Sequence, residues 1–507
     1  MASTIKEVRL AHFSWLGLIL GASAFADSAG DLSQANRLLE EGRNAMAARY
    51  AFSAGGESPA AANALITEAL MREGLPQAAS YFFIRTLQSG DQSAIRKVLS
   101  HTQALTVSVG ADLLRKYLIR HTKYEDYDPG QKSAYLYALG KDSLLDKKEE
   151  RAIGYLNGIS AKTQLWPFAL QLRGTAYAIL GKTQDALRDF RACVDRAEDY
   201  PKNKEAMDLR ARCQASVARV LYQMNRFDEA DRVYDSIPKA SLVWPDILFE
   251  QAWNGFAKGE FNKTLGKLVS YKSPALSFVL NSEVDVLRAQ SYLGLCLYSD
   301  ANDEINHFHE KYSKVGEEVK RFVESNSGNS DAFYRLGRTV LGGPLHTRNP
   351  FHRMVNRFIR GPYFQNLVAA ESQIEYEVKA LKASGDLNSS MVQSGSGFAD
   401  FITKVLEWRK RSTREIGGAF VKNSLMDYHS MLIADFEKIA FIKLEMLGRA
   451  KDKLLARKSQ SADRFRGNQE PARRDDQYRW GFNGEFWTDE LGDYVFGLES
   501  ECGEGRS

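Results

Sequence analysis

A ladder of small and aromatic residues recurs along the middle of this 507-residue chain and limits its fold more than any other feature. The clearest copy lies between Leu165 and Glu198. Two helices that cross closely need small side chains at the crossing and large ones beside it, and a residue free to take positive φ favours a helix end. The members of this copy are Gly174, Tyr177, Gly181, Ala186, Phe190 and Cys193. This order predicts two helices joined by a turn at Gly181.

The same order returns in later segments of the chain. The equivalent small positions are Ala186, Ala230, Thr264 and Ala301, with separations of 44, 34 and 37 residues. Two units also open alike, with Trp-Pro at residues 166–167 and 244–245. Other members of these units are Ala218, Leu221, Tyr234, Ala252, Gly255, Gly259, Ala289, Tyr292, Ile305 and Phe308, and weaker units hold Ala69, Ala78, Phe82, Gly140, Ala152 and Leu156. We expect a helical repeat array over residues 31–312.

This ladder resembles the tetratricopeptide (TPR) repeat, whose period is about 34 residues. The resemblance implies an all-α fold, a TPR-like α-solenoid of antiparallel helix pairs. Composition agrees, because 12 prolines in a chain that is 44% hydrophobic favour long, packed helices. A net charge of +4 gives no reason to expect nucleic acid as a partner.

The N-terminus has the pattern of an export signal. Lys6 and Arg9 precede the apolar stretch 13–20, and Ala24-Phe25-Ala26 has the form of a cleavage site. We therefore expect residues 1–26 to be a signal peptide, the mature chain to lie in the periplasm, and no later segment to span a membrane.

The pattern changes after Tyr312. An irregular helical and Arg-rich connecting region covers 313–397, and its window from Tyr334 to Ala370 has no acidic residue. Residues 398–457 predict C-terminal helices with a turn or kink at Gly417-Gly418, 459–478 a charged linker, and 479–507 an aromatic and acidic tail. The candidate partner-binding arginines of the window are Arg335, Arg338, Arg348, Arg353, Arg357 and Arg360.

The tail places six large rings within residues 480–496, so these rings must pack on something. The surface is either the chain's own C-terminal helices or another protein; Trp480, Phe482 and Trp487 are the candidate partner-binding residues, with Trp487 the expected anchor. A turn at Asn483-Gly484 and a short helix at 488–491 are expected. The tail's net charge of −6 over residues 481–507 also suggests a latch onto the arginine window, unless each segment is simply solvated.

No nucleotide-binding, zincin or hydrolase motif occurs, so we expect no enzyme, no catalytic residue, no cofactor and no metal. His307 and His309 are two positions apart on a helix and point in different directions. Cys193 and Cys213 lie on helices that a solenoid packs against each other, so they are either bridged or simply small core residues.

The chain resembles, more loosely, periplasmic TPR proteins of adventurous gliding-motility complexes. The matching features are the export signal, the repeats, the helical C-terminal region and the closing motif, whose residues are Trp480, Phe482, Gly484, Glu485, Trp487, Asp489, Glu490, Leu491, Gly492 and Tyr494. The resemblance implies a non-enzymatic scaffold that binds other envelope proteins in an envelope-spanning complex. The alternative is an accessory protein that binds cell wall or another anionic polymer through the arginines.

Overall fold

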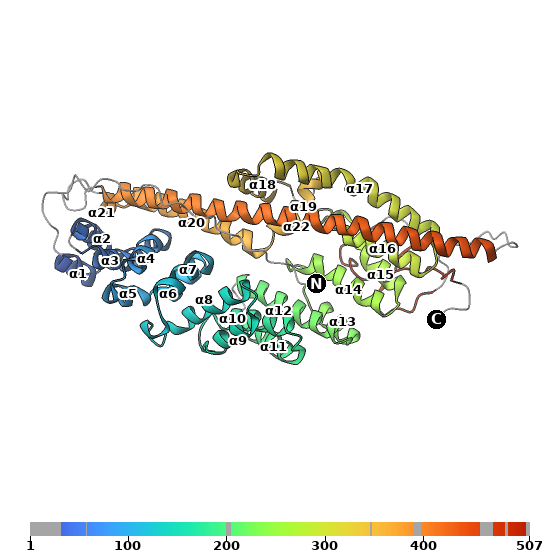
Figure 1. Cartoon of the computed structure of the whole chain (residues 1–507), viewed down its shortest axis with the longest axis horizontal. Helices are drawn as coiled ribbons and strands as arrows, with labels where there is room; N and C mark the ends of the chain where they lie inside the picture. The colour runs from blue at the N-terminus through green and yellow to red at the C-terminus, as the bar shows by residue number, and fades with distance from the viewer. Residues whose placement is uncertain are drawn as a thin grey trace. The chain divides into compact units, whose positions relative to one another are not determined.

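The computed structural model describes residues 32–56, 58–198, 204–344, 347–388, 397–456, 470–481 and 485–502. The expected signal peptide, 1–26, lies outside them. These residues form twenty-two α-helices and one small sheet, so the all-α, solenoid-like class is confirmed (Figure 1). Contacts divide the chain into two units: the first takes Met1–Arg196 and Asn366–Ile416, and the second takes Ala197–Gln365 and Gly417–Ser507. Each unit therefore contains a stretch of repeats and a later segment that returns to it.

The first unit is a run of short helices in which neighbours along the chain pack together, as α3 with α4 and α8 with α9. Its core joins early helices to the beginning of α22, where Phe398, Ile402 and Leu406 are fully buried. The ring of Phe52 lies 5.2 Å from that of Phe398. The helices are α1 Leu32–Glu40, α2 Asn44–Ser53, α3 Pro59–Arg72, α4 Pro76–Ser89, α5 Gln92–Leu99, α6 Thr102–Val109, α7 Ala111–His121, α8 Lys132–Leu145, α9 Glu149–Asn157, α10 Trp166–Ile179, α11 Thr183–Glu198, α20 Pro362–Ala383, α21 Gly385–Asn388 and α22 Phe398–Ala456.

The second unit continues the helix pairs, and its strands come from the tail. Strands β1 and β2 pair in parallel, with Tyr478 opposite Tyr494. Helix α22 contributes its residues from 417 onward to this unit. The remaining elements are α12 Lys204–Gln223, α13 Phe227–Asp235, α14 Trp244–Ala257, α15 Phe261–Val269, α16 Ser282–Gly294, α17 Tyr298–Ser325, α18 Ser330–Gly342, α19 Pro350–Ile359, β1 Tyr478–Arg479 and β2 Tyr494–Val495.

The ladder residues lie at the contacts within helix pairs. A Cβ added to Gly174 would meet the Phe190 ring at 2.8 Å, so α10 and α11 approach as closely as only a glycine permits. Gly181 follows α10 with φ of +71°, a conformation that glycine adopts without strain. Tyr177 is half-buried. Nine further ladder residues are buried: Ala186, Phe190, Ala218, Ala230, Tyr234, Ala252, Ala289, Tyr292 and Ala301.

Gly417 and Gly418 do not end a helix, so the expected turn between two C-terminal helices is wrong. Helix α22 runs through both glycines. A Cβ on Gly418 would lie 2.0 Å from the Ser330 carbonyl oxygen, and one on Gly417 would lie 2.6 Å from the Tyr334 ring. The pair of glycines therefore lets the start of α18 touch the backbone of α22.

A buried polar cluster holds the first unit together. The Glu377 carboxylate on α20 accepts hydrogen bonds from the backbone N–H groups of Gln77 and Ala78, both at 2.9 Å. These N–H groups belong to the first turn of α4 and have no partner within that helix, so a residue 300 positions away caps it. Arg409 on α22 donates to the Gln77 side chain at 3.1 Å and to the Val109 carbonyl at 3.3 Å. Burial raises the pKa of Glu377 to about 7, despite these donors and the nearby Arg409.

Candidate functional site

The aromatic tail lies on the repeat helices of the second unit. Asn262 at the start of α15 holds the tail on both sides: its carbonyl accepts from the Phe496 N–H at 3.1 Å, and its side chain exchanges two bonds of 3.0 Å with Leu498. Gly492 donates its N–H to the Ser270 hydroxyl at 2.9 Å. The tail thus packs on its own chain. The surface is α14–α16, whereas the expected surface within the chain was the C-terminal helices.

The tail approaches α15 at backbone distance. A Cβ on Gly266 would lie 1.9 Å from the Tyr494 carbonyl oxygen. No other residue type fits there unless the tail moves, since Cβ atoms essentially never come within 3 Å of another heavy atom. Tyr494, Val495 and Phe496 are buried around this point. The missing side chain of Gly266 therefore allows the backbone of the tail to contact α15.

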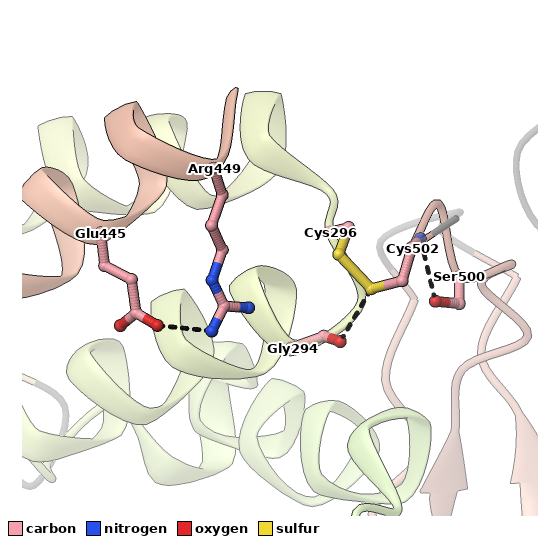
Figure 2. The surroundings of a disulfide bond; sticks show 6 residues. All are labelled: Gly294, Cys296, Glu445, Arg449, Ser500 and Cys502. Carbon is pink, nitrogen blue, oxygen red and sulfur yellow. Dashed lines mark hydrogen bonds and ion pairs between the residues drawn. A yellow bond between two sulfur atoms is a disulfide. The ribbon is translucent and has the colours of Figure 1, made fainter. Parts of the chain in front are cut away.

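A disulfide fastens the end of the tail. Cys296, in the turn after α16, is bonded to Cys502, with 5.1 Å between their Cα atoms (Figure 2). The Glu501 N–H donates to the Leu295 carbonyl at 2.8 Å beside it. Among the described residues no cysteine is free. Cys193 and Cys213 are fully buried and neither is a free thiol, while their pairing with each other stays a prediction.

Trp487 does not anchor the tail, which corrects the expected role of this residue within the chain. Its side chain is 62% exposed, whereas Trp480 is only 7% exposed. Trp480 packs inside the tail, 4.8 Å from the Phe486 ring and 5.0 Å from that of Tyr494. Residues 488–491 form a turn instead of the expected helix. The Asp493 N–H donates to the Glu490 carbonyl, and the chain then continues as strand β2, which pairs with β1. Phe482, Asn483 and Gly484 lie outside the described residues.

Part of the segment expected as a charged linker belongs to the docked tail. Gln477 is buried, and Arg474 pairs with Asp235 at the end of α13 at 2.9 Å. Lys239 holds the tail's acidic turn, binding the Asp489 carbonyl and, at 3.1 Å, the Asp493 carboxylate. The acidic turn of the tail therefore pairs with the repeats, while the latch onto the arginine window stays a prediction.

The six arginines of the window do not gather into one patch. Arg335 pairs with Asp331 at 3.1 Å on its own helix, and Arg338 and Arg348 are exposed. Arg353 and Arg357 instead turn to the loop before α16, where they donate to the Val279 carbonyl at 3.2 Å and to the Asn281 side chain at 3.1 Å. Arg360 lies over the Phe278 ring at 6.0 Å. Three of the six arginines thus contact residues 278–281, the loop before α16, in the same unit.

Helix α22 has a second apolar stripe that the sequence analysis missed. Its buried face carries the expected series from Val421 to Met446. At 100° per residue, another apolar series falls on the opposite side of the helix within about 60° of a common line. Its members are exposed by 48–71%: Met426, Ile433, Phe441, Leu444 and Leu447. An exposed row of large apolar side chains is typical of a surface that binds protein. We call these five residues the α22 stripe.

No group of three or more metal-ligating side chains occurs among the described residues, and His309 packs against Phe436 with ring centroids 5.4 Å apart. None of the described helices combines the length and apolar character needed to cross a membrane.

No family model matches the sequence, and no curated protein matches it. Among solved structures, the Rap conjugation gene regulator of the plasmid pLS20, in complex with the Phr* peptide, is 13% identical, with 57% of this chain and 76% of that chain covered and a TM-score of 0.26. A circular tandem repeat protein with novel repeat topology is 12% identical, with 81% and 89% covered and a TM-score of 0.12. At these TM-scores neither similarity assigns a function to this chain.

Proposed function

We propose that this protein is a non-enzymatic scaffold that is exported to the periplasm and binds protein partners of an envelope complex. The observation that carries the binding role is the α22 stripe, because large apolar side chains exposed along one helix line lose their contact with water only when a partner covers them. The partner class is a protein that presents an apolar helical face, which packs on such a stripe at helix spacing.

Three observations support this proposal. The Cys296–Cys502 bond suits an oxidising compartment, in line with the export signal expected at residues 1–26. The chain forms helical repeats, and repeat arrays of this kind commonly present extended binding surfaces. Trp487, within the docked tail, adds a large exposed ring to the surface. Membership of a gliding-motility complex is the narrower form of the same proposal.

The anionic-polymer alternative has less in its favour. A polymer needs a continuous row of free cations, whereas Arg353, Arg357 and Arg360 are directed to the loop at residues 278–281. We therefore keep the protein-binding scaffold as the proposed function.

Site-specific photocrosslinking in living cells tests the proposal. A photoreactive residue replaces Phe441 or Leu444 of the α22 stripe, and Met431 serves as control, since it is 40% exposed on the same helix but lies off the stripe. We expect the same envelope protein to be crosslinked at both stripe positions and not at Met431. Crosslinks to no protein, or equally from all three positions, would contradict it.

A substitution pair gives a second readout. Phe441→Glu together with Leu444→Glu changes exposed positions only, so the free energy of unfolding should shift by less than about 1 kcal/mol while recovery of the partner is lost. Met431→Glu should leave both unchanged. Trp487→Ala separates the tail from the stripe: a loss of recovery at unchanged stability would place the tail in the interface as well.

A further inference from the structure

A cavity of about 290 Å³ lies within the second unit, where α16, α17 and α19 meet the short turn 270–272. Its volume is just below the range of pockets for drug-sized ligands, about 300–1,000 Å³, so it suits a small ligand. No motif in the sequence points to it. Its charged and titratable lining comes from four segments: Tyr271, Lys272, Asp285, Arg288, Glu304, His307, Lys311 and Arg353.

The positive charges of this lining outnumber the negative ones. Four cations (Lys272, Arg288, Lys311 and Arg353) face two carboxylates (Asp285 and Glu304), an excess of two positive charges with His307 neutral. The carboxylates are already used. Asp285 pairs with Lys311 at 2.7 Å and with Arg288 at 3.2 Å, and Glu304 pairs with Arg288.

The remaining two cations have little protein to compensate them. Lys272 lies 3.9 Å from Glu304, at the limit of an ion pair. Burial lowers the pKa of Lys272, and the charge of Arg288 lowers it further. Arg353 contacts no carboxylate in the described structure that would neutralise it; its Nη2 donates to the Val279 carbonyl at 3.2 Å. Lys272 thus has only a long ion pair and Arg353 has none among the described residues, and the lining keeps two more cations than carboxylates.

Arg353 also has hydrogen-bonding capacity to spare. Its Nε atom is buried and has no hydrogen-bond partner among the described residues. A buried N–H without a partner loses its hydrogen bond to water and gains none in return, which is unfavourable. A guanidinium offers paired N–H groups that match two oxygens of a phosphate or carboxylate, so one oxyanion would satisfy both the charge and the open donor.

We propose that this cavity binds a small dianionic oxyanion compound, with Arg353 as the forked donor and Lys272 as the second cation. An excess of two positive charges selects a dianion, which a phosphate monoester and a dicarboxylate both provide at neutral pH. The site is separate from the α22 stripe, so it goes beyond the scaffold function and stands or falls independently of it.

Titration calorimetry on the full mature chain tests the site, at pH 7.5 and low ionic strength, with inorganic phosphate and succinate as separate probes. We expect saturable binding of at least one probe with one site per chain; phosphate binding assigns a phosphate ligand and succinate binding a dicarboxylate. Arg353→Gln should weaken that binding at least 10-fold. Arg348→Gln is the matched control, because Arg348 is exposed in the same arginine window and does not line the cavity.

A second variant keeps the proposal testable if Arg353→Gln fails to fold. Lys272→Gln changes a side chain that is 55% exposed and should weaken binding at least threefold at unchanged thermal stability. No saturable binding of either probe, or an equal loss in Arg348→Gln, overturns the proposal. Partner crosslinking at the α22 stripe is expected to be normal in both cavity variants.

Discussion

In each of the two units a later part of the chain packs on the repeat helices, but the interactions that hold it there differ. In the first unit, α20 and the start of α22 bring Glu377 and Arg409 into a buried polar cluster that caps α4. In the second, a tail with little regular structure is held by backbone contacts, buried rings and the Cys296–Cys502 bond. Helices can be closed by packing and a few directed polar groups, whereas a short irregular segment needs a covalent bond to offset its conformational entropy.

Removing the disulfide should give the largest effect and be confined to the second unit. Cys296 and Cys502 are 206 residues apart, and a bond across so long a loop restricts the unfolded chain strongly. We expect Cys296→Ser with Cys502→Ser to lower the free energy of unfolding by about 4 kcal/mol. Hydrogen exchange should show the loss in the tail and α15–α16, with α3–α4 unchanged; equal loss in both units would refute the separation.

Breaking the polar cluster should be the matching experiment in the first unit. Arg409→Met removes the donor to Gln77 and Val109 and leaves Glu377 without a nearby cation. Removal of one partner from a buried charged cluster costs about 3 kcal/mol. Arg411→Met, at an exposed position on the same helix, is the control. It should change the free energy of unfolding, measured by chemical denaturation, by less than about 0.5 kcal/mol.

The close approach at Gly266 offers a way to release the tail with the disulfide still formed. Gly266→Ala puts a Cβ where the Tyr494 carbonyl lies, so the tail must shift, and we expect a loss of about 2 kcal/mol in the free energy of unfolding. Gly154→Ala, in α9 with open space around it, should be neutral or stabilising by up to about 1 kcal/mol. If both variants behave alike, the tail does not depend on this contact.

The smallest expected effect is the pH dependence that Glu377 gives to the first unit. A carboxyl group with a higher pKa in the folded state contributes stability below its ordinary pKa, and that contribution is lost as the pH rises through the folded value. The pKa of Glu377 is raised to about 7. Relative to Glu377→Gln, the wild-type free energy of unfolding should therefore fall by about 1 kcal/mol between pH 6 and 7. Denaturation of Glu375→Gln, at an exposed neighbouring site, should show no such trend.

The repeats were predictable because their signal is local. Gly174 and Phe190 are 16 residues apart, and the pair that they mark is complete within one stretch of sequence. The α22 buried face was predictable for the same reason, since one helix carries the whole periodic series.

The remaining features depend on residues far apart in the chain. Gly417 and Gly418 look like a break until Ser330 is seen beside them. Gly266 gives no local sign that a tail 228 residues later crosses it at Tyr494. Four cysteines allow three pairings, and nothing in the spacing of Cys296 and Cys502 selects theirs. The even cysteine count, in a chain expected to carry an export signal, was a hint that these cysteines are bonded.

The Cys296–Cys502 bond also decides what a protease can accomplish. It closes the chain from residue 296 to residue 502 into a covalent ring, which includes α17–α22 and the tail. A single cut at any peptide bond within this ring leaves the two fragments joined through their sulfur atoms. The nicked protein would keep its full mass on a non-reducing gel and separate into two bands only after reduction, so one cleavage inside this ring does not by itself release any part of the protein.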